Sequence, residues 1–128
     1  MQFKFNAGFT LIELMVTVAI VGILAIIANA SYSSFLLKGY RSDAESYMMS
    51  VAQLEQQYFT DNRSYAGTVA ALNSSVPASV SPNYTISIAT TAGPPPSYTI
   101  TATAIGSQVA DGNLTLDNFG AKTPSASW

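Results

Sequence analysis

The first half of the chain carries a helical hydrophobic pattern, which is apolar on every side at first and amphipathic later, without an interruption between the two parts. Every residue from Phe9 to Ala28 is uncharged except Glu13, and apolar side chains would surround a helix built from this run. Such a helix is about 30 Å long, which matches the thickness of a bilayer core. The run is therefore expected to lie in lipid or among other helices.

Beyond this run, apolar residues recur at steps of three and four, which is the period of an amphipathic helix. Polar residues, Arg41 among them, fall largely between them. We predict one helix from about Thr10 to about Thr60, ended by Asp61 and Asn62. The apolar positions of its second half are Tyr32, Phe35, Leu36, Tyr40, Tyr47, Met48, Val51, Leu54, Tyr58 and Phe59.

From residue 83 onward the period changes to two, which is typical of half-buried strands. A turn-rich connection over residues 63–82 precedes the first strand, with a short helical turn near residues 69–72. The loop of residues 93–96 predicts an antiparallel hairpin, and a third strand and a short fourth one follow. The alternating positions are Tyr84, Ile86, Ile88, then Tyr98, Ile100, Ala102, Ala104, then Leu114 and Leu116, with the fourth strand near residues 121–123.

These elements predict an α+β fold, in which a long N-terminal helical spine packs on a small antiparallel sheet. We divide the chain of 128 residues into a leader (1–8), a transmembrane or filament-core half of the helix (9–30) and a globular domain (31–128). The globular domain holds the second half of the helix, the connection 63–82 and the sheet 83–128.

The composition of the chain limits the classes of function that we expect. The formal net charge is −2 and only 9% of residues are charged, so a basic face for nucleic acid is not expected. The chain has no cysteine and no histidine, which excludes thiolate and imidazole zinc sites and the Ser-His-Asp triad. We find no nucleophile with a base, and we expect neither an enzyme nor a cofactor.

Glu13 is the most informative residue of the apolar run. A charge at bilayer depth costs about 2.5–3.5 kcal/mol on insertion scales, and it usually marks function and implies a partner. A short leader with one basic residue, Lys4, and a glycine, Gly8, stands immediately before Phe9. This arrangement indicates an export and assembly signal.

The run Gly8-Phe9-Thr10-Leu11-Ile12-Glu13 resembles the prepilin signal of type IV pilins and pseudopilins. The resemblance implies the pilin fold, cleavage between Gly8 and Phe9 by a prepilin peptidase, and N-methylation of Phe9. It also implies assembly through Phe9, Glu13 and the helix glycine Gly22. Residues 113–128 are similar to small minor pilins of the type IVa system.

The resemblance further implies where the protein works and with what. It predicts a type IV pilus subunit, a minor rather than a major pilin, in a filament used for adhesion, twitching motility or DNA uptake. The precursor would wait in the inner membrane with a periplasmic domain and then join an extracellular pilus. Its expected partners are other pilin subunits, the prepilin peptidase and the pilus assembly platform.

Physical chemistry explains why Glu13 belongs in such a signal. Cleavage before Phe9 creates an ammonium about one helical turn away from Glu13. A desolvated carboxylate is costly alone and tolerable when paired. Glu13 can therefore offset its own terminus or that of a neighbouring subunit, and so set the axial register of a filament.

Two features depart from the family pattern. Minor pilins of this type often close the C-terminal region with a disulfide, which a chain without cysteine cannot form. The family also commonly has a proline in the helix where this chain has Ala30.

Other readings stay open. Ala28-Asn29-Ala30 fits a signal-peptidase site, and the apolar run also fits a simple membrane anchor. A type II secretion pseudopilin and a DNA-uptake receptor share the predicted architecture. Asp111, Asn113 and Asp117 are weak calcium candidates, and turns beside a strand explain them better. The aromatic series on the helix is expected to be core rather than a path for electrons.

Overall fold

The computed structural model describes residues 8–125 and 128, so most of the expected leader lies outside the described residues. The chain divides into two compact units, residues 1–35 and 36–128. The helix α1 runs through both, and the second unit adds two 3-10 helices and four strands. Their bounds are α1 Leu11–Asn62, η1 Ala70–Leu72, β1 Tyr84–Thr91, β2 Ser97–Ala104, η2 Gly106–Ala110, β3 Leu114–Asp117 and β4 Lys122–Thr123.

The single long helix is confirmed. It continues through Gly22 and Ala30 without interruption and ends at Asn62, close to the expected stop. The next residue, Arg63, has a positive φ of 58° and donates its backbone N–H to the carbonyl of Phe59 at 2.8 Å. A left-handed residue that bonds back to the last turn is a common way for a helix to end.

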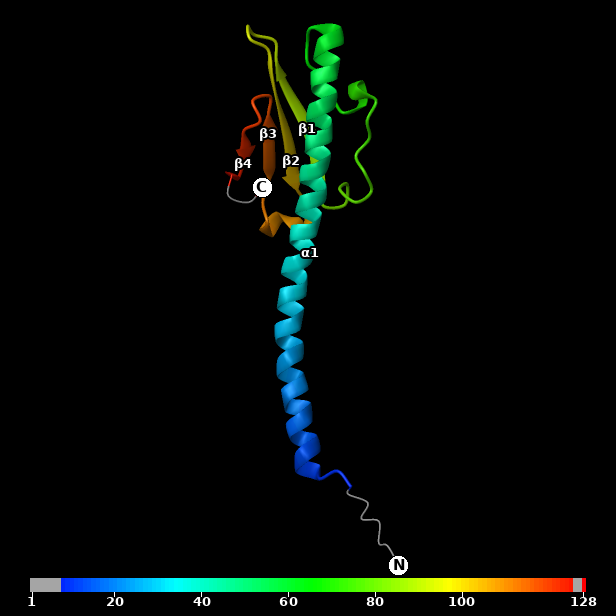
Figure 1. Cartoon of the computed structure of the whole chain (residues 1–128), viewed down its shortest axis with the longest axis vertical. Coiled ribbons are helices and arrows are strands. Elements are labelled where there is room, and N and C mark those ends of the chain that lie inside the picture. Colours follow the sequence, from blue (N-terminus) through cyan, green and yellow to red (C-terminus); the bar gives the residue numbers. More distant parts are fainter. Residues whose placement is uncertain (1–7, 126–127) are drawn as a thin grey trace, which may run out of the picture. The chain divides into compact units, whose positions relative to one another are not determined.

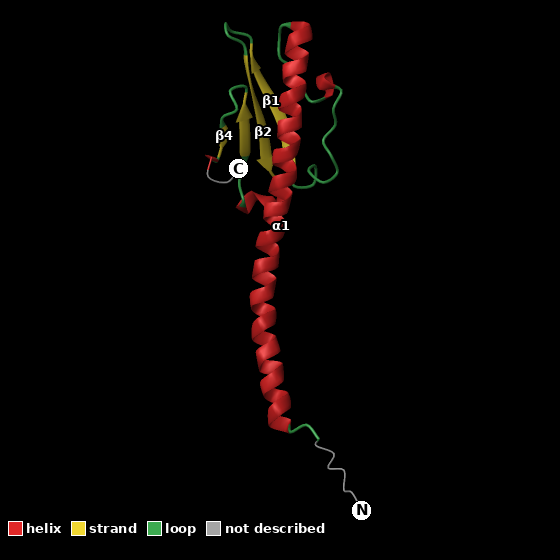
Figure 2. Cartoon of the chain, in the orientation of Figure 1, coloured by secondary structure: helices red, strands yellow, loops and turns green. Residues whose placement is uncertain are grey.

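The four predicted strands form one antiparallel sheet in the order β1-β2-β3-β4. Ile100 of β2 lies opposite Ile88 on one side and Leu116 on the other, so their side chains share a face. Figure 1 shows the second half of α1 alongside the strands, and Figure 2 separates helix from sheet by colour. The α+β class and the predicted hairpin are therefore confirmed.

The core of the second unit lies between one stripe of α1 and one face of the sheet. The helix contributes Ala44, Met48 and Val51, all 0% exposed. The sheet contributes the alternating residues of β2 and β3, which are buried as their period predicts. The buried strand residues are Tyr84, Tyr98, Ile100, Ala102, Ala104, Leu114 and Leu116.

Two aromatic residues do not lie where the sequence pattern placed them. Tyr32 and Phe35 were expected on the covered face of the helix, but they are 64% and 74% exposed and belong to the first unit. The periodicity of the sequence therefore predicted a longer buried face than the helix has. At the other end, Phe59 stacks on Tyr65, whose ring meets Tyr98 edge-on.

A buried carboxylate anchors the segment after the helix. Glu55 is 0% exposed, and its Oε2 accepts the backbone N–H of Ala66 at 2.8 Å. Its Oε1 has no hydrogen-bond partner among the described residues, and no described cation forms an ion pair with it. Burial therefore raises the pKa of the Glu55 carboxyl, and the Ala66 hydrogen bond opposes that shift.

The C-terminal tryptophan packs back onto the last strand. Trp128 Nε1 donates to the carbonyl of Thr123 at 3.1 Å, and the Lys122 ammonium lies 4.8 Å from its ring centre. The indole also contacts the edge of the core. In a chain without cysteine, this side chain holds the C-terminal residue against the last strand by packing and a cation–π contact.

We expect Glu55 to make stability depend on pH. A raised folded-state pKa favours the native state fully below the ordinary value of 4.5, and the gain is lost as pH rises through the raised pKa. Glu55→Gln keeps an acceptor for Ala66 and cannot ionise, so it should remove this part of the pH dependence. Thermal unfolding of the full chain in detergent, from about pH 5 to about pH 8, measures it.

Glu55→Ala is the matched variant. It leaves the buried Ala66 N–H without an acceptor, which should lower the free energy of unfolding by about 1–3 kcal/mol at every pH. Burial also raises the pKa of Glu45, so the informative quantity is the difference between wild type and Glu55→Gln. Identical pH profiles for these two proteins would contradict the assignment to Glu55.

Candidate functional site

The helix begins with a reciprocal cap formed by two residues of the expected signal. The Thr10 Oγ1 accepts the backbone N–H of Glu13 at 3.3 Å, and Glu13 Oε2 lies 3.5 Å from the backbone nitrogen of Thr10. Leu14 donates the first helical hydrogen bond to the Thr10 carbonyl at 3.2 Å. This is a capping box, with Thr10 at the cap and Glu13 three residues later.

The cap places Gly8 and Phe9 outside the helix. An added Cβ on Gly8 would meet no atom within 4 Å, and Gly8 shows no positive φ that would require glycine. The same holds for Gly22 inside the helix. The described chain therefore has no packing reason of its own for either glycine, so any requirement for them must come from a partner.

The apolar residues that follow the cap are uncovered. Phe9 is 80% exposed and Ile26 is 75% exposed, and the large apolar residues between them are at least half exposed. The most apolar stretch of 18 residues has a mean hydropathy of 2.7, and the described chain buries none of it. By length and composition this part of the helix is able to cross a membrane.

A second polar cluster lies inside the second unit, and we call it the polar clamp: Arg41, Tyr84, Gln108 and Asp111. The Arg41 Nε lies 2.9 Å from Asp111 Oδ2, and Arg41 Nη2 donates to the Asp111 carbonyl at 3.2 Å. Arg41 is 8% exposed, so this ion pair is largely desolvated. It joins α1 to the segment that follows η2.

Gln108, which lies in η2, completes the polar clamp. Its Nε2 lies within 2.9–3.0 Å of three acceptors, namely Asp111 Oδ2, the Tyr84 hydroxyl and the carbonyl of Leu37. The Tyr84 hydroxyl donates to Asp111 at 3.3 Å. Burial raises the pKa of Tyr84, which keeps this hydroxyl protonated as a donor.

The three calcium candidates do not share a site. Asp111 belongs to the polar clamp, and Asn113 Oδ1 accepts the backbone N–H of Ala104 at 2.9 Å. Asp117 Oδ1 accepts two backbone N–H groups of its own turn, from Phe119 and Ala121. Each of these oxygens thus has protein partners of its own, and the described residues contain no group of three His, Cys, Asp or Glu side chains that could hold a metal ion.

Sequence reasoning missed the buried polar residues. Arg41 was expected on the solvated face, yet it is three residues before Ala44 and seven before Met48, on the buried stripe. Glu55 likewise follows Val51 by one helical turn. Their spacing was therefore a usable signal. No such spacing signal marked Gln108, because it lies in the short helix η2 and contacts residues far away in sequence.

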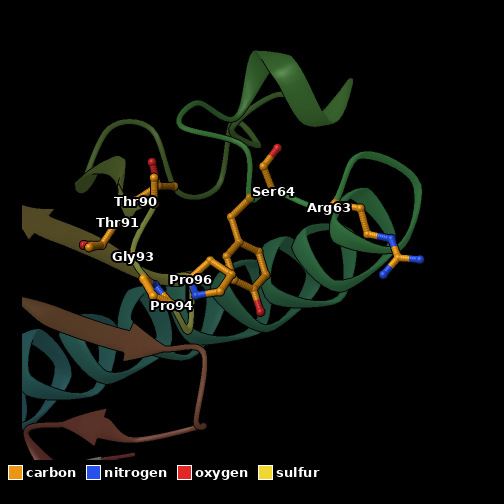
Figure 3. A pocket seen from close by; sticks show the side chains of 9 residues that line it. Arg63, Ser64, Thr90, Thr91, Gly93, Pro94 and Pro96 are labelled. Atoms are coloured by element: carbon orange, nitrogen blue, oxygen red, sulfur yellow. The ribbon is translucent and has the colours of Figure 1, made fainter.

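A pocket of about 410 Å³ lies where the tip of the β1–β2 hairpin meets the segment after α1. Tyr65, Pro94 and Pro96 supply its apolar walls, with Thr90 and Thr91 beside them. In the close-up of Figure 3, the Arg63 side chain points away from the hairpin residues. The guanidinium is therefore at the rim, available to solvent.

Two family models match the chain. One, described as "Type IV minor pilin ComP, DNA uptake sequence receptor", covers residues 30–115, which is more than half of the chain. The other, the prokaryotic N-terminal methylation motif, covers residues 3–29. The chain belongs to the type IV pilin family. The predicted membership of this family is confirmed, and the prepilin signal is confirmed as a methylation motif.

Pilins are also found among single proteins similar to this chain. The fimbrial protein EcpC of Eikenella corrodens is 33% identical over 105 residues, which span 82% of this chain and 67% of that protein. The type IV major pilin protein PilA of Myxococcus xanthus is 38% identical over 61 residues. That match spans 48% of this chain and only 28% of the relative.

The solved structure of a type IV pilin from Shewanella oneidensis shares the fold. It superposes with a TM-score of 0.57 at 28% identity, over 72% of this chain and 97% of the pilin. Members of this family are structural subunits that assemble into a pilus with other pilins. The family description also names a DNA uptake sequence receptor, which runs against our expectation that nucleic acid is not a partner.

We expect the polar clamp to matter for the stability of this pilin. Arg41→Ala leaves the Asp111 carboxylate largely buried without its cation, which should lower the free energy of unfolding by about 2–3 kcal/mol. Lys38→Ala, one helical turn earlier and exposed, is the control and should change it by less than about 0.5 kcal/mol. Chemical denaturation of the full chain in detergent measures both, and equal effects would contradict the assignment.

Proposed function

We propose that the chain is cut between Gly8 and Phe9, methylated at Phe9 and built into a type IV pilus as a minor subunit. The observation that carries this proposal is the capping box at Thr10 and Glu13, directly after the motif that matches the methylation family. Because the helix begins at this box, Gly8 and Phe9 lie before it in non-helical backbone. A peptidase needs such backbone, since a helix hides its own peptide groups.

Glu13 has two possible roles in this scheme. It caps the helix through Thr10, and after cleavage it meets the new ammonium of Phe9. The distances from the Glu13 carboxylate to Thr10 are long, 3.4–3.5 Å, so the carboxylate is not committed to the cap. An ammonium adds the attraction of an opposite full charge to the hydrogen bond, and this attraction is much stronger in lipid than in water, which favours transfer of the carboxylate to the ammonium.

The uncovered apolar helix supplies the surface for assembly. Its own chain leaves it exposed, so lipid covers it before assembly and neighbouring helices cover it afterwards. Gly22 supports this view, because small residues let helices approach closely in an apolar medium. The space around Gly22 in the single chain is open, as a site reserved for a neighbour would be.

The same reasoning assigns the compartments. We propose that residues 9–30 anchor the precursor in the inner membrane and that the globular part faces the periplasm. Prepilin peptidase and the assembly platform then act on the membrane-bound form. In the pilus, residues 31–128 would lie on the outside, where adhesion, motility and uptake of DNA take place.

DNA uptake is the second candidate for the use of this pilus, and the family description favours it. The described globular residues offer few cations for it. Arg41 is held in the polar clamp and Lys122 lies over Trp128, while Lys38 and Arg63 are exposed. One or two phosphate contacts per subunit are therefore the most this surface provides.

We expect variants of the capping box to separate the two roles of Glu13. Glu13→Gln keeps an oxygen for the cap and loses the charge, and Thr10→Ala loses the cap and keeps the charge. If the charge pairs with Phe9, Glu13→Gln should reduce incorporation into pili by about tenfold or more, the effect of losing about 1.4 kcal/mol. Thr10→Ala should reduce it far less.

The measurement is the amount of protein in sheared pili relative to the amount in membranes. Mass spectrometry of the mature protein reports cleavage and methylation in the same samples. Normal membrane levels with absent pilus protein show an assembly defect. Wild-type incorporation of Glu13→Gln would contradict the pairing, and mature wild-type protein that does not begin at Phe9 would contradict the proposed processing.

DNA binding is tested with the full chain in detergent and duplex DNA at several salt concentrations. Each phosphate contact adds about 0.9 to the slope of log affinity against log salt, so a slope of about 1–2 is expected. Arg63→Gln should lower the magnitude of this slope by about 1. Lys38→Gln is the matched variant, because it removes one positive charge from another part of the surface. Absence of binding at low salt would remove this candidate.

A further inference from the structure

The globular unit presents one large apolar side chain to solvent on a tightly held turn. Phe119 is 80% exposed and lies between β3 and β4. Asp117 Oδ1 accepts the N–H groups of Phe119 at 2.9 Å and Ala121 at 2.8 Å, and the backbones of Asp117 and Ala121 are hydrogen-bonded. Gly120 takes the positive φ of 80° that the turn requires.

Such a turn fixes the backbone that carries the Phe119 ring before any partner arrives. A backbone that is already ordered loses less conformational entropy on binding, and aromatic anchors are enriched among the residues that dominate interfaces. Phe119 contributes no buried core contact, since the core consists of other residues. Its position is therefore better explained by a partner than by the fold.

A groove of about 450 Å³ lies beside this ring, between the turn and α1. Its apolar walls come from Met49, Ala52, Tyr98, Leu116 and Phe119. Met49 is itself 42% exposed, although it is adjacent to the fully buried Met48. The ring and the groove together form one apolar surface, which we call the Phe119 surface.

The charges around this surface are already engaged. Asp117 accepts hydrogen bonds within its own turn, and Lys122 lies over the ring of Trp128. The other polar side chains that line the groove are the amides of Gln53, Gln56 and Asn118 and the hydroxyl-bearing Tyr98. This chemistry suits an uncharged apolar protein segment whose backbone groups bond to side-chain amides, and it does not suit a phosphate backbone.

We propose that the Phe119 surface binds a neighbouring pilin subunit in the filament, with Phe119 as the anchor and an apolar side chain of the neighbour in the groove. Pilin subunits are the partners that family membership establishes, and a helical filament requires each subunit to present surfaces to its neighbours. This inference rests on the incorporation into pili proposed above. It adds a contact made by the globular unit to those of the helix.

Site-specific photocrosslinking tests the proposal in the cells that make this protein. A photoreactive phenylalanine analogue replaces Phe119, and in a second strain it replaces Val109, which is 62% exposed in η2 and outside the groove. We expect a crosslink from position 119 to another pilin in sheared pili and none from position 109. Crosslinks from 119 to DNA, to proteins other than pilins, or to nothing would overturn the proposal.

Substitutions give an independent readout. Phe119→Ser and Met49→Gln should each lower the ratio of pilus protein to membrane protein by about tenfold, whereas Phe119→Leu and Val109→Ser should keep it near wild type. Unchanged membrane levels show that the variants fold. If wild-type protein is in pili and Phe119→Ser enters them equally well, only the Phe119 surface fails. If wild-type protein never enters pili, the proposed function itself fails.

Discussion

One helix must satisfy two different surroundings, and the remaining structure follows from that constraint. α1 runs unbroken over 52 residues. Along its first part, the described chain covers none of the apolar surface of α1. Lipid or other helices therefore have to remove this surface from water. Along its second part the same helix buries a narrow stripe against a sheet. The sheet therefore gives the second unit a core of its own, while the apolar surface of the first part is left for lipid or other helices to cover.

Sequence periodicity predicted what depends on local pattern. The helix, its end near Asn62, the hairpin and the two short strands all follow from changes of period and from turn residues, and each is present. The prediction extended the buried face to Tyr32 and Phe35 because period does not say where a covering layer stops. The capping box is also visible in the sequence as Thr10 followed three residues later by Glu13.

The polar residues of the core show the other limit. Arg41 and Asp111 are 70 residues apart, and nothing in either neighbourhood announces the other. Asp111 looked like a possible metal ligand because aspartates and asparagines cluster in that stretch, whereas the fold sends each oxygen to a different backbone or side-chain donor. Breaking a buried ion pair leaves a charge without compensation, so the pair penalises arrangements in which its two residues separate. In this pilin the pair joins α1 to the segment that follows η2.

The capping box and the family motif together explain why a carboxylate persists in an apolar helix. Before processing, Glu13 has a weak partner in Thr10, at distances long enough to be given up. In the proposed mature chain it would have an ammonium one turn away, and in a filament the ammonium of another subunit. The carboxylate would thus never be wholly without a hydrogen-bond donor. An ammonium would stabilise it more than Thr10 does, because it adds an opposite charge in a medium of low dielectric constant. In the proposed scheme, this difference makes a processed subunit better suited than its precursor to the apolar surroundings of a filament.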